Sequence, residues 1–209
     1  MAKNILVIGA GAGIGLATAR KFRQEGFGVG LVARNLERTR AEAQALGGHA
    51  YAADAGDFGA LSQAVAQAEH DLGGLDVLLY NAVASNWQPL AAVSSEQLVQ
   101  DFRVNVGGAH AAVLTALSGL KARGGSVLLT GGGLALSPGA QAGALAVGKA
   151  GLRSLALSLH AELAPLGVHV GTLTVMGTVG DDQKITAAGV AGQFWTLYQD
   201  RGAEAQYAG

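Results

Sequence analysis

A glycine-rich turn is the first feature of the sequence that points to chemistry. Residues 5–8 form an apolar run, residues 9–15 contain four glycines, and a helical pattern extends over 13–25. Glycines let the chain turn tightly and let main-chain N–H groups approach a pyrophosphate, which then lies at the positive end of the helix. Such a loop can also serve close packing alone, but a strand before it and a helix after it favour phosphate binding. We predict that a dinucleotide is bound by Gly9, Gly11, Ala12, Gly13, Ile14 and Gly15.

Two arginines after the second apolar run bear on which dinucleotide would bind. In a fold that selects NAD, an acidic residue at the end of the second strand binds the ribose diol. Here the run ends in Ala33-Arg34-Asn35, and the first acid, Glu37, lies in the next helical pattern. A guanidinium forms charge-assisted hydrogen bonds with a 2′-phosphate, which a carboxylate would repel. We predict that NADP(H) is preferred over NAD(H) and is bound by Arg34, Asn35 and Arg38, although both arginines could instead form a solvated helix face.

The glycine spacing resembles that of the short-chain dehydrogenase/reductase family. Gly9-x3-Gly13-x-Gly15 fits the family pattern Thr-Gly-x3-Gly-x-Gly, with Ile8 in place of Thr. Further matches follow, and together the similarity covers roughly residues 3–180. The resemblance implies that Asp54 accepts a hydrogen bond from the adenine amino group. It implies further cofactor contacts at Ala55, Asn81, Ala82, Val83 and Gly177.

The motifs behind those contacts match to different degrees. Asp54-Ala55-Gly56-Asp57 matches the family's Asp-x-x-Asp, although Asp57 is better explained as a helix cap. Asn81-Ala82 matches the middle of Asn-Asn-Ala-Gly, and Met176-Gly177 stands where the family has Pro-Gly. The cofactor-binding half of the pattern is therefore well represented.

The resemblance also identifies the catalytic positions, and two of them lack the usual side chain. Asn105 matches the family's active-site Asn, and Lys149 matches the lysine that binds the cofactor ribose. Leu145 stands at the position of the catalytic Tyr and Gly132 at that of the catalytic Ser. The Tyr is the family's proton donor, whereas Leu145 can neither donate nor accept a proton. Asn105 and Lys149 are the catalytic residues that we predict.

Two functions therefore stay open at the level of sequence. One is an NADP(H)-dependent oxidoreductase that acts on a carbonyl or alcohol through a rearranged proton donor. The other is a catalytically inactive dinucleotide-binding sensor or partner-binding module. Four hydroxyl groups could approach the crevice and supply a proton, although a structural role explains each of them better: those of Tyr80, Ser85, Ser137 and Tyr198.

The elements that must position these residues alternate along the chain. Apolar runs predict strands over 5–8, 29–33, 49–53, 77–79, 127–130 and 168–174. Helical patterns occupy 13–25, 36–46, 57–72, 95–122, 140–164 and 187–200. Such alternation predicts one doubly wound α/β domain (a Rossmann fold) over residues 1–209, with six or so parallel strands and a short helical tail from about 187. The ligand crevice then lies at the carboxyl edge of the sheet, next to Gly9, Arg34, Asp54, Asn81, Thr130 and Gly177.

Composition excludes several classes of function. The net charge is −1 and only 14% of residues are charged, so no electrostatic footprint for nucleic acid or an anionic membrane is expected. The chain has no cysteine, and His110 and His160 have no partner at ligand spacing, so we expect neither a thiolate nucleophile nor a metal site. No apolar run is long enough for a signal segment or a membrane span, which predicts a cytoplasmic protein.

The pattern over 140–164 suggests a subunit interface. Its only charges are Lys149, Arg153 and Glu162, so it is apolar nearly all round. An outer helix of this kind needs a cover, and we predict a homodimer through the fourth helix (95–122) and the fifth (140–164). The family's seventh strand, which forms a second interface, is expected to be absent, so a dimer is expected rather than a tetramer. The loop over 178–192 is short and leaves the substrate open.

Overall fold

The computed structural model describes residues 2–209 and contains one sheet of parallel strands in the order β3-β2-β1-β4-β5-β6-β7. The crossover from β3 back through β1 to β4 creates the strand-order reversal of a doubly wound fold. This confirms the predicted α/β class. The strands are β1 (Asn4–Ile8), β2 (Gly28–Ala33), β3 (His49–Ala52), β4 (Val77–Tyr80), β5 (Ser126–Thr130), β6 (His169–Val175) and β7 (Glu204–Tyr207).

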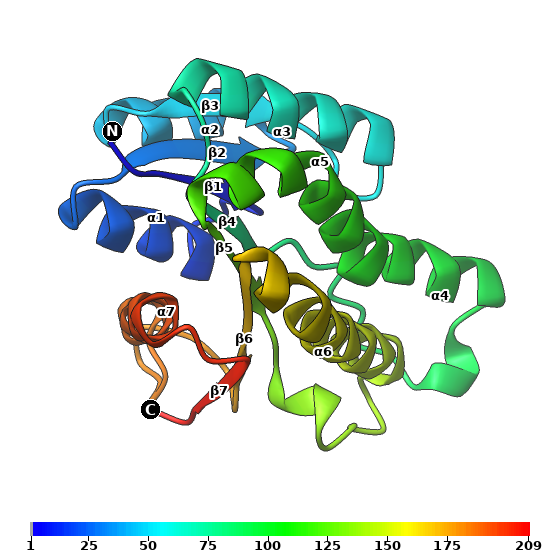
Figure 1. Ribbon diagram of the computed structural model, residues 1–209. Coiled ribbons are helices and arrows are strands. Elements are labelled where there is room, and N and C mark those ends of the chain that lie inside the picture. Colours follow the sequence, from blue (N-terminus) through cyan, green and yellow to red (C-terminus); the bar gives the residue numbers. More distant parts are fainter. Residues whose placement is uncertain (1) are drawn as a thin grey trace.

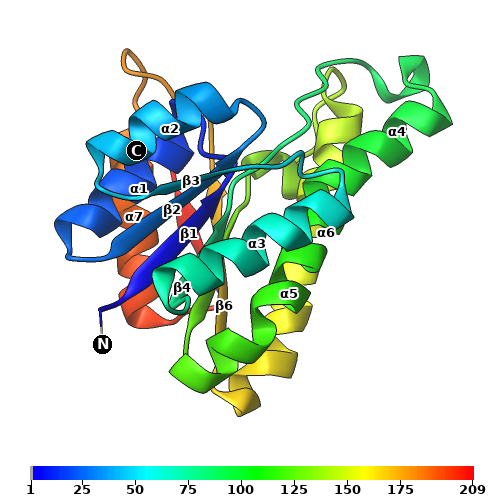
Figure 2. The same ribbon diagram turned by 90° about the horizontal axis from the view of Figure 1, so that it is seen from above.

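Helices cover both faces of the sheet (Figure 1). One face packs against α1 (Ile14–Gln24), α2 (Leu36–Ala45) and α7 (Ala187–Asp200). The other packs against α3 (Phe58–Leu72), α5 (Gly108–Arg123) and α6 (Gly143–Leu163). The remaining helix, α4 (Ser95–Phe102), projects beyond the sheet (Figure 2). Within the described chain, no helix combines the length and the apolar character needed to cross a membrane.

Burial on both faces explains why the strands read as continuous apolar runs. Every residue of β1, β4, β5 and β6 is buried, which is the pattern of a parallel sheet between two helical layers. Helix ends follow local chemistry. The side chain of Asp57 accepts from the N–H of Ala60, which confirms the expected cap. The side chain of Ser94 caps α4 in the same way by accepting from the N–H of Gln97.

The long helix expected over 95–122 is interrupted. It divides into α4 and α5 around a π-helical turn at Arg103–Gly107. Directly after this turn, an added Cβ at Gly108 would lie 2.3 Å from the carbonyl oxygen of Ala55. The helix therefore approaches the β3–α3 loop so closely that only glycine fits at this position. π-turns of this kind frequently mark functional sites. Similarly, the helix expected over 140–164 begins only at Gly143 and closes with a 3₁₀ turn at Ala164–Leu166.

The seventh strand is present, so the expectation that it is absent was wrong. β7 pairs in parallel with β6, from Thr172 opposite Glu204 to Val175 opposite Tyr207. Its sequence, Glu-Ala-Gln-Tyr, has no apolar run. An edge strand can be held by main-chain pairing and by polar contacts instead. Here the carboxylate of Glu204 accepts hydrogen bonds from Nε and Nη2 of Arg153, at 2.7 and 2.6 Å, and from the hydroxyl of Thr174 at 3.1 Å.

Candidate functional site

The glycine-rich turn lies between the carboxyl end of β1 and the start of α1, as expected. Gly9 adopts a left-handed φ of 83°, and an added Cβ would lie 2.5 Å from the main-chain nitrogen of Ala82. A Cβ at Gly15 would lie 2.4 Å from the carbonyl oxygen of Gly9. The protein's own packing therefore demands glycine at both positions.

The two middle glycines have a different environment. A Cβ at Gly11 or Gly13 would meet no other atom of the protein within 4 Å. Within residues 2–209, the main-chain N–H groups of Ala12, Gly13 and Ile14 have no hydrogen-bond acceptor, and no side chain caps α1. Free N–H groups at a helix N-terminus form an anion-binding site. The open turn thus fits the diphosphate of a dinucleotide.

A cavity of about 490 Å³ extends from this turn along the carboxyl ends of β1, β2, β3 and β4. It brings together most of the predicted cofactor-binding residues: Gly9, Gly11, Arg34, Asn35, Arg38, Asp54, Ala55, Asn81, Ala82 and Val83. Six further residues, for which no cofactor contact is predicted from the sequence, also line the wall: Ile8, Val32, Ala33, Ala53, Ala84 and Val104. Five of these six belong to the strand ends or to the segments that follow them, whereas Val104 lies in the π-turn, which no sequence signal indicated.

The end of the cavity near β2 carries positive charge. Arg34 and Arg38 are exposed on its wall, and within the described residues neither guanidinium has a hydrogen bond or an ion pair. Asn35 caps α2 by accepting from the N–H of Arg38 at 3.0 Å. The only acid on the wall is Asp54, whose Oδ1 accepts from the N–H of Gly56 at 2.8 Å. Two cations here therefore face solvent with their charge uncompensated.

A chain of hydrogen bonds runs from the glycine turn to Lys149. The side chain of Asn81 donates to the carbonyl oxygen of Gly9 at 2.9 Å and accepts from the hydroxyl of Thr130 at 2.9 Å. Lys149 Nζ, from α6, donates to the carbonyl oxygen of Thr130 at 2.7 Å. Thr130 was placed at the sheet edge from the sequence but was not recognised as the link between Asn81 and Lys149. Gly9 and Asn81, predicted to bind the cofactor, thus belong to one connected group with the predicted catalytic residue Lys149.

Lys149 lies against the position where the family carries its serine. A Cβ at Gly132 would lie 3.5 Å from Lys149 Cε and 3.6 Å from its Cδ, and the three atoms nearest to it all belong to this lysine. Leu145, one helical turn before Lys149 on α6, is 5% exposed. Burial lowers the pKa of Lys149 to about 8. The residues at positions 132 and 145 therefore offer this lysine no side chain that could donate or accept a proton.

The side-chain amide of Asn105, the other predicted catalytic residue, is hydrogen-bonded to main-chain groups. In the π-turn, its Oδ1 accepts from the N–H of Ala84 at 2.8 Å and its Nδ2 donates to the carbonyl oxygen of Ala84 at 3.2 Å. An added Cβ at Gly148 would lie 2.6 Å from Asn105 Nδ2, so α6 passes directly over this amide. This geometry gives Asn105 a positioning role for the segment that lines the cavity.

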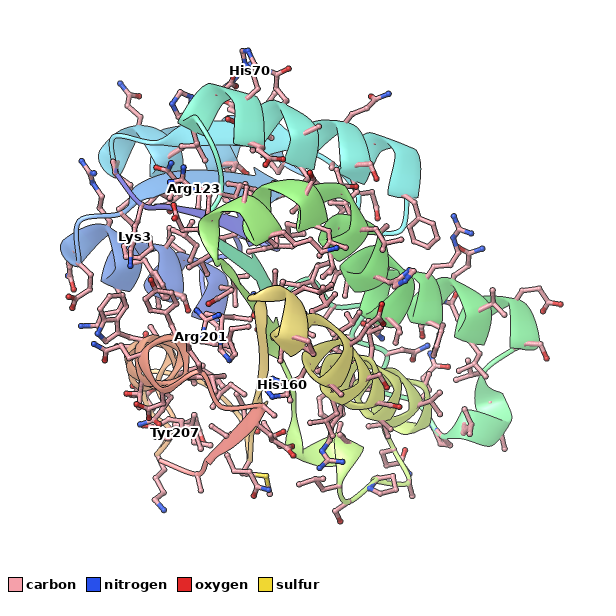
Figure 3. All side chains as sticks on the ribbon, in the orientation of Figure 1. Lys3, His70, Arg123, His160, Arg201 and Tyr207 are labelled. Carbon is pink, nitrogen blue, oxygen red and sulfur yellow. The ribbon has the colours of Figure 1, made fainter. Side chains whose placement is uncertain are left out.

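The alternative hydroxyl groups are engaged or distant. Tyr80 is buried and donates to the carbonyl oxygen of Val104, and burial, followed by the charge of Asp54, raises its pKa. Ser85 accepts from the indole N–H of Trp87 at 2.9 Å. Tyr198 accepts from Lys3 Nζ at 2.9 Å, and Lys3 lies beside α1 just before the amino end of β1 (Figure 3), so Tyr198 does not fold over the crevice. The exposed Ser137 follows the 3₁₀ turn Gly133–Ala135.

The remaining predicted positions lie around the same edge. Gly177 follows β6 and is exposed, with the Ile185 side chain 3.1 Å from the place of its missing Cβ. Met176 lies beside Gly133, with its Sδ 3.5 Å from the corresponding place. Across residues 2–209, no group of three or more acidic or histidine side chains is arranged to hold a metal ion.

Comparison with known proteins identifies a family and several relatives that this chain resembles. Residues 3–184 match the family profile described as short chain dehydrogenase. An L-rhamnose 1-dehydrogenase (NAD(P)(+)) of Azotobacter vinelandii is 31% identical over 191 residues, covering 86% of this chain and 74% of the relative. A short chain dehydrogenase from Burkholderia cenocepacia in complex with NADP superposes with a TM-score of 0.88 at 27% identity, covering 98% and 94% of the two chains. A metagenomic short-chain oxidoreductase in complex with NADP gives 0.86 at 25% identity, covering 98% and 96%.

Proposed function

The chain belongs to the short-chain dehydrogenase family, and from this membership we propose that it is an NADP(H)-dependent oxidoreductase acting on a carbonyl or alcohol. The observation that carries the proposal is the open glycine turn next to two uncompensated arginines on one cavity wall. Solved relatives of similar fold are complexes with NADP, which supports the same cofactor here. A bound NADPH supplies a hydride to the carbonyl carbon of the substrate.

The residues fit the parts of this cofactor one by one. The N–H groups of Ala12, Gly13 and Ile14 would hold the diphosphate, because they have no acceptor of their own within the described chain. Arg34 and Arg38 would hold the 2′-phosphate through charge-assisted hydrogen bonds. Asp54 would accept from the adenine amino group, and Lys149 would bind the ribose hydroxyls.

Titration with nucleotide tests the cofactor proposal directly. NADPH fluorescence should change on binding, and its dissociation constant should be well below that of NADH. Equal affinities for the two nucleotides would contradict the preference. No binding of either nucleotide at millimolar concentration would overturn the function as a whole.

One observation favours a second function, a dinucleotide-binding sensor or partner-binding module without turnover. The positions that carry Ser and Tyr in the family are Gly132 and Leu145, neither of which can donate a proton. Loss of a general acid typically costs a factor of about 10²–10⁴ in rate. Under this alternative the protein binds NADPH with the same preference but reduces no carbonyl compound.

We also propose that two copies of the chain pair through α4, α5 and α6. These helices expose large apolar side chains at Val99, Phe102, Leu114 and Val147. Covering them in a two-fold interface would remove apolar area from water, which is the main driving force of association. A molar mass of one chain in light scattering at micromolar concentration would contradict this proposal.

A further inference from the structure

Three polar side chains of the strand ends and the π-turn are committed to partners within the fold. The hydroxyl of Thr130 donates to Asn81, and the amide of Asn105 is used on both sides by Ala84. The hydroxyl of Tyr80 donates to a carbonyl oxygen in the π-turn. Each of these groups would have to break a partly buried hydrogen bond before it could serve a substrate.

Lys149 differs from these groups because it has protons to spare. A lysine ammonium carries three N–H donors. In the described chain, Lys149 uses one of them, on the carbonyl oxygen of Thr130. It therefore retains N–H donors that no other residue engages.

Position 132 contacts the methylene chain that carries this ammonium. The place of the missing Cβ lies 3.5 Å from Lys149 Cε, which is one bond from Nζ, and the three nearest atoms to that place are all methylene carbons of the lysine. The backbone at Gly132 is extended, so its lack of a side chain leaves room beside the lysine and relieves no strain. The place that a side chain at position 132 would occupy is therefore in contact with the chain that carries Nζ.

We propose that Lys149 is the proton donor of this protein, and that its ammonium protonates the oxygen of a carbonyl substrate placed beside Gly132. This inference rests on the proposed oxidoreductase function. The family resemblance assigns the lysine to the cofactor ribose and assigns the proton to a tyrosine, which is Leu145 here. The assignment therefore gives Lys149 a second task.

The step balances with the cofactor as the reductant. The carbonyl carbon gains a hydride from the dihydronicotinamide, and the π electron pair moves to the oxygen. That oxygen takes a proton from Lys149, which becomes a neutral amine and is reprotonated by water. The products are the alcohol and the oxidised nucleotide.

The environment of Lys149 suits this task. Its ammonium donates to the main-chain carbonyl oxygen of Thr130, and its methylene chain lies against Gly132. Burial lowers its pKa to about 8, with no contribution from a charged group. An acid is most effective when its pKa lies near the working pH. The ammonium is thus still largely protonated at neutral pH but gives up its proton more readily than an exposed lysine.

The first test needs neither cofactor nor substrate. The lysines of the apo protein are labelled with a trace of acetic anhydride over pH 6–11, and the extent at Lys149 and Lys121 is read by peptide mass spectrometry. Lys121 is exposed on α5 and serves as the internal reference. We expect a midpoint near pH 8 for Lys149. A midpoint at about 10.4, the ordinary value for a lysine side chain, would overturn the proposal.

The second test uses variants of the full chain with NADPH and two activated ketones, 2,2,2-trifluoroacetophenone and 2,3-butanedione. Lys149→Met should lower kcat at least about 100-fold. Lys149→Arg keeps the positive charge but does not release a proton, so its kcat should also fall. In wild type we expect kcat to decline above about pH 8, and this decline should be absent in Lys149→Arg. Lys121→Met is the matched control and should behave as wild type. Retained kcat in Lys149→Arg would show an electrostatic role only and overturn the assignment.

The outcomes separate this inference from the proposed function. If the wild type reduces a ketone and Lys149→Arg does so equally well, only the role of Lys149 is wrong. If the wild type binds NADPH and reduces neither ketone, while Gly132→Ser with Leu145→Tyr reduces one, both the role of Lys149 and the oxidoreductase proposal are wrong. If the wild type does not bind NADPH, the proposed function itself is wrong, whatever the role of Lys149.

Discussion

The side chain of Asn105 holds both main-chain polar groups of Ala84, accepting from its N–H at 2.8 Å and donating to its carbonyl oxygen at 3.2 Å. Ala84 lines the cavity, and Asn105 lies in the π-turn that interrupts the long helix. The helical layer and the cavity wall are thereby joined through one amide.

Replacing Asn105 should therefore affect both stability and binding. Asn105→Ala leaves the polar groups of Ala84 without their partner, which we expect to cost about 1–3 kcal/mol of unfolding free energy. NADPH affinity should fall as well, because the wall loses its support. Urea denaturation and NADPH titration measure the two effects. Gln100→Ala on the exposed part of α4 is the control, and a loss no larger than in this control would contradict the role of Asn105.

Two glycines of the turn should respond in opposite ways to the same change. Gly9→Ala places a Cβ 2.5 Å from a main-chain nitrogen at a positive φ, so we expect a loss of stability of at least about 1–3 kcal/mol. Gly11→Ala meets open space, so stability should stay within about 0.5 kcal/mol while NADPH affinity falls about tenfold. Gly192→Ala on α7 also meets open space and should leave NADPH affinity unchanged. Unchanged affinity in Gly11→Ala would argue against diphosphate binding at the turn.

Arg34 should determine the preference between the two nucleotides. Arg34→Ala removes charge-assisted hydrogen bonds to the 2′-phosphate, each of which is worth about 1.5–3 kcal/mol. NADPH affinity should fall by at least about tenfold while NADH affinity stays the same. Arg40→Ala, on the exposed side of α2, removes a charge of the same sign from the helix that follows Arg34 and controls for the general field. Equal losses for both nucleotides in Arg34→Ala would refute a phosphate-specific contact.

Burial of Lys149 should make stability depend on pH in a defined window. Its pKa is lowered from 10.5 to about 8 in the folded protein, so between these values the unfolded chain binds more protons and unfolding free energy rises with pH. Each pKa unit corresponds to about 1.4 kcal/mol, so Lys149→Met should gain up to about 3 kcal/mol over wild type at pH 7. The gain should shrink as pH rises from about 8 to 10.5. A gain that is the same at pH 7 and pH 10.5, measured against Lys121→Met, would contradict this account.

Restoring the family's catalytic side chains should change the rate of ketone reduction. A serine at 132 has room, since its Cβ would lie 3.5 Å from Lys149 Cε in ordinary contact. A tyrosine at 145 replaces a side chain that is 5% exposed, so we expect about 1–3 kcal/mol of destabilisation from overpacking. If the double variant still folds, reduction of 2,3-butanedione with NADPH should rise by about 10²–10⁴. A folded double variant with the parent's rate would indicate that the nicotinamide end of the site is not arranged as in the family.

The sequence alone was sufficient for the fold class and for most of the cavity wall. Buried parallel strands require continuous apolar runs, and the residues after such runs meet at one edge because parallel strands all end there. Gly9, Arg34, Asp54 and Asn81 were therefore placed together correctly without coordinates. That they bind NADP(H) stays a prediction until nucleotide is titrated.

Only the tertiary structure decided how the separate motifs are connected. No periodicity distinguishes the π-turn at Arg103–Gly107 from a regular helix. The close approach of Gly108 to Ala55, directly after this turn, joins segments that lie far apart in sequence. The polar strand β7 was not predicted for the same reason, because the residues that bind its Glu204, Arg153 and Thr174, belong to other elements. Likewise, the link from Gly9 through Asn81 and Thr130 to Lys149 depends on side-chain distances that spacing along the chain does not contain. Local patterns determine which elements form, whereas contacts between distant residues exist only after those elements have packed.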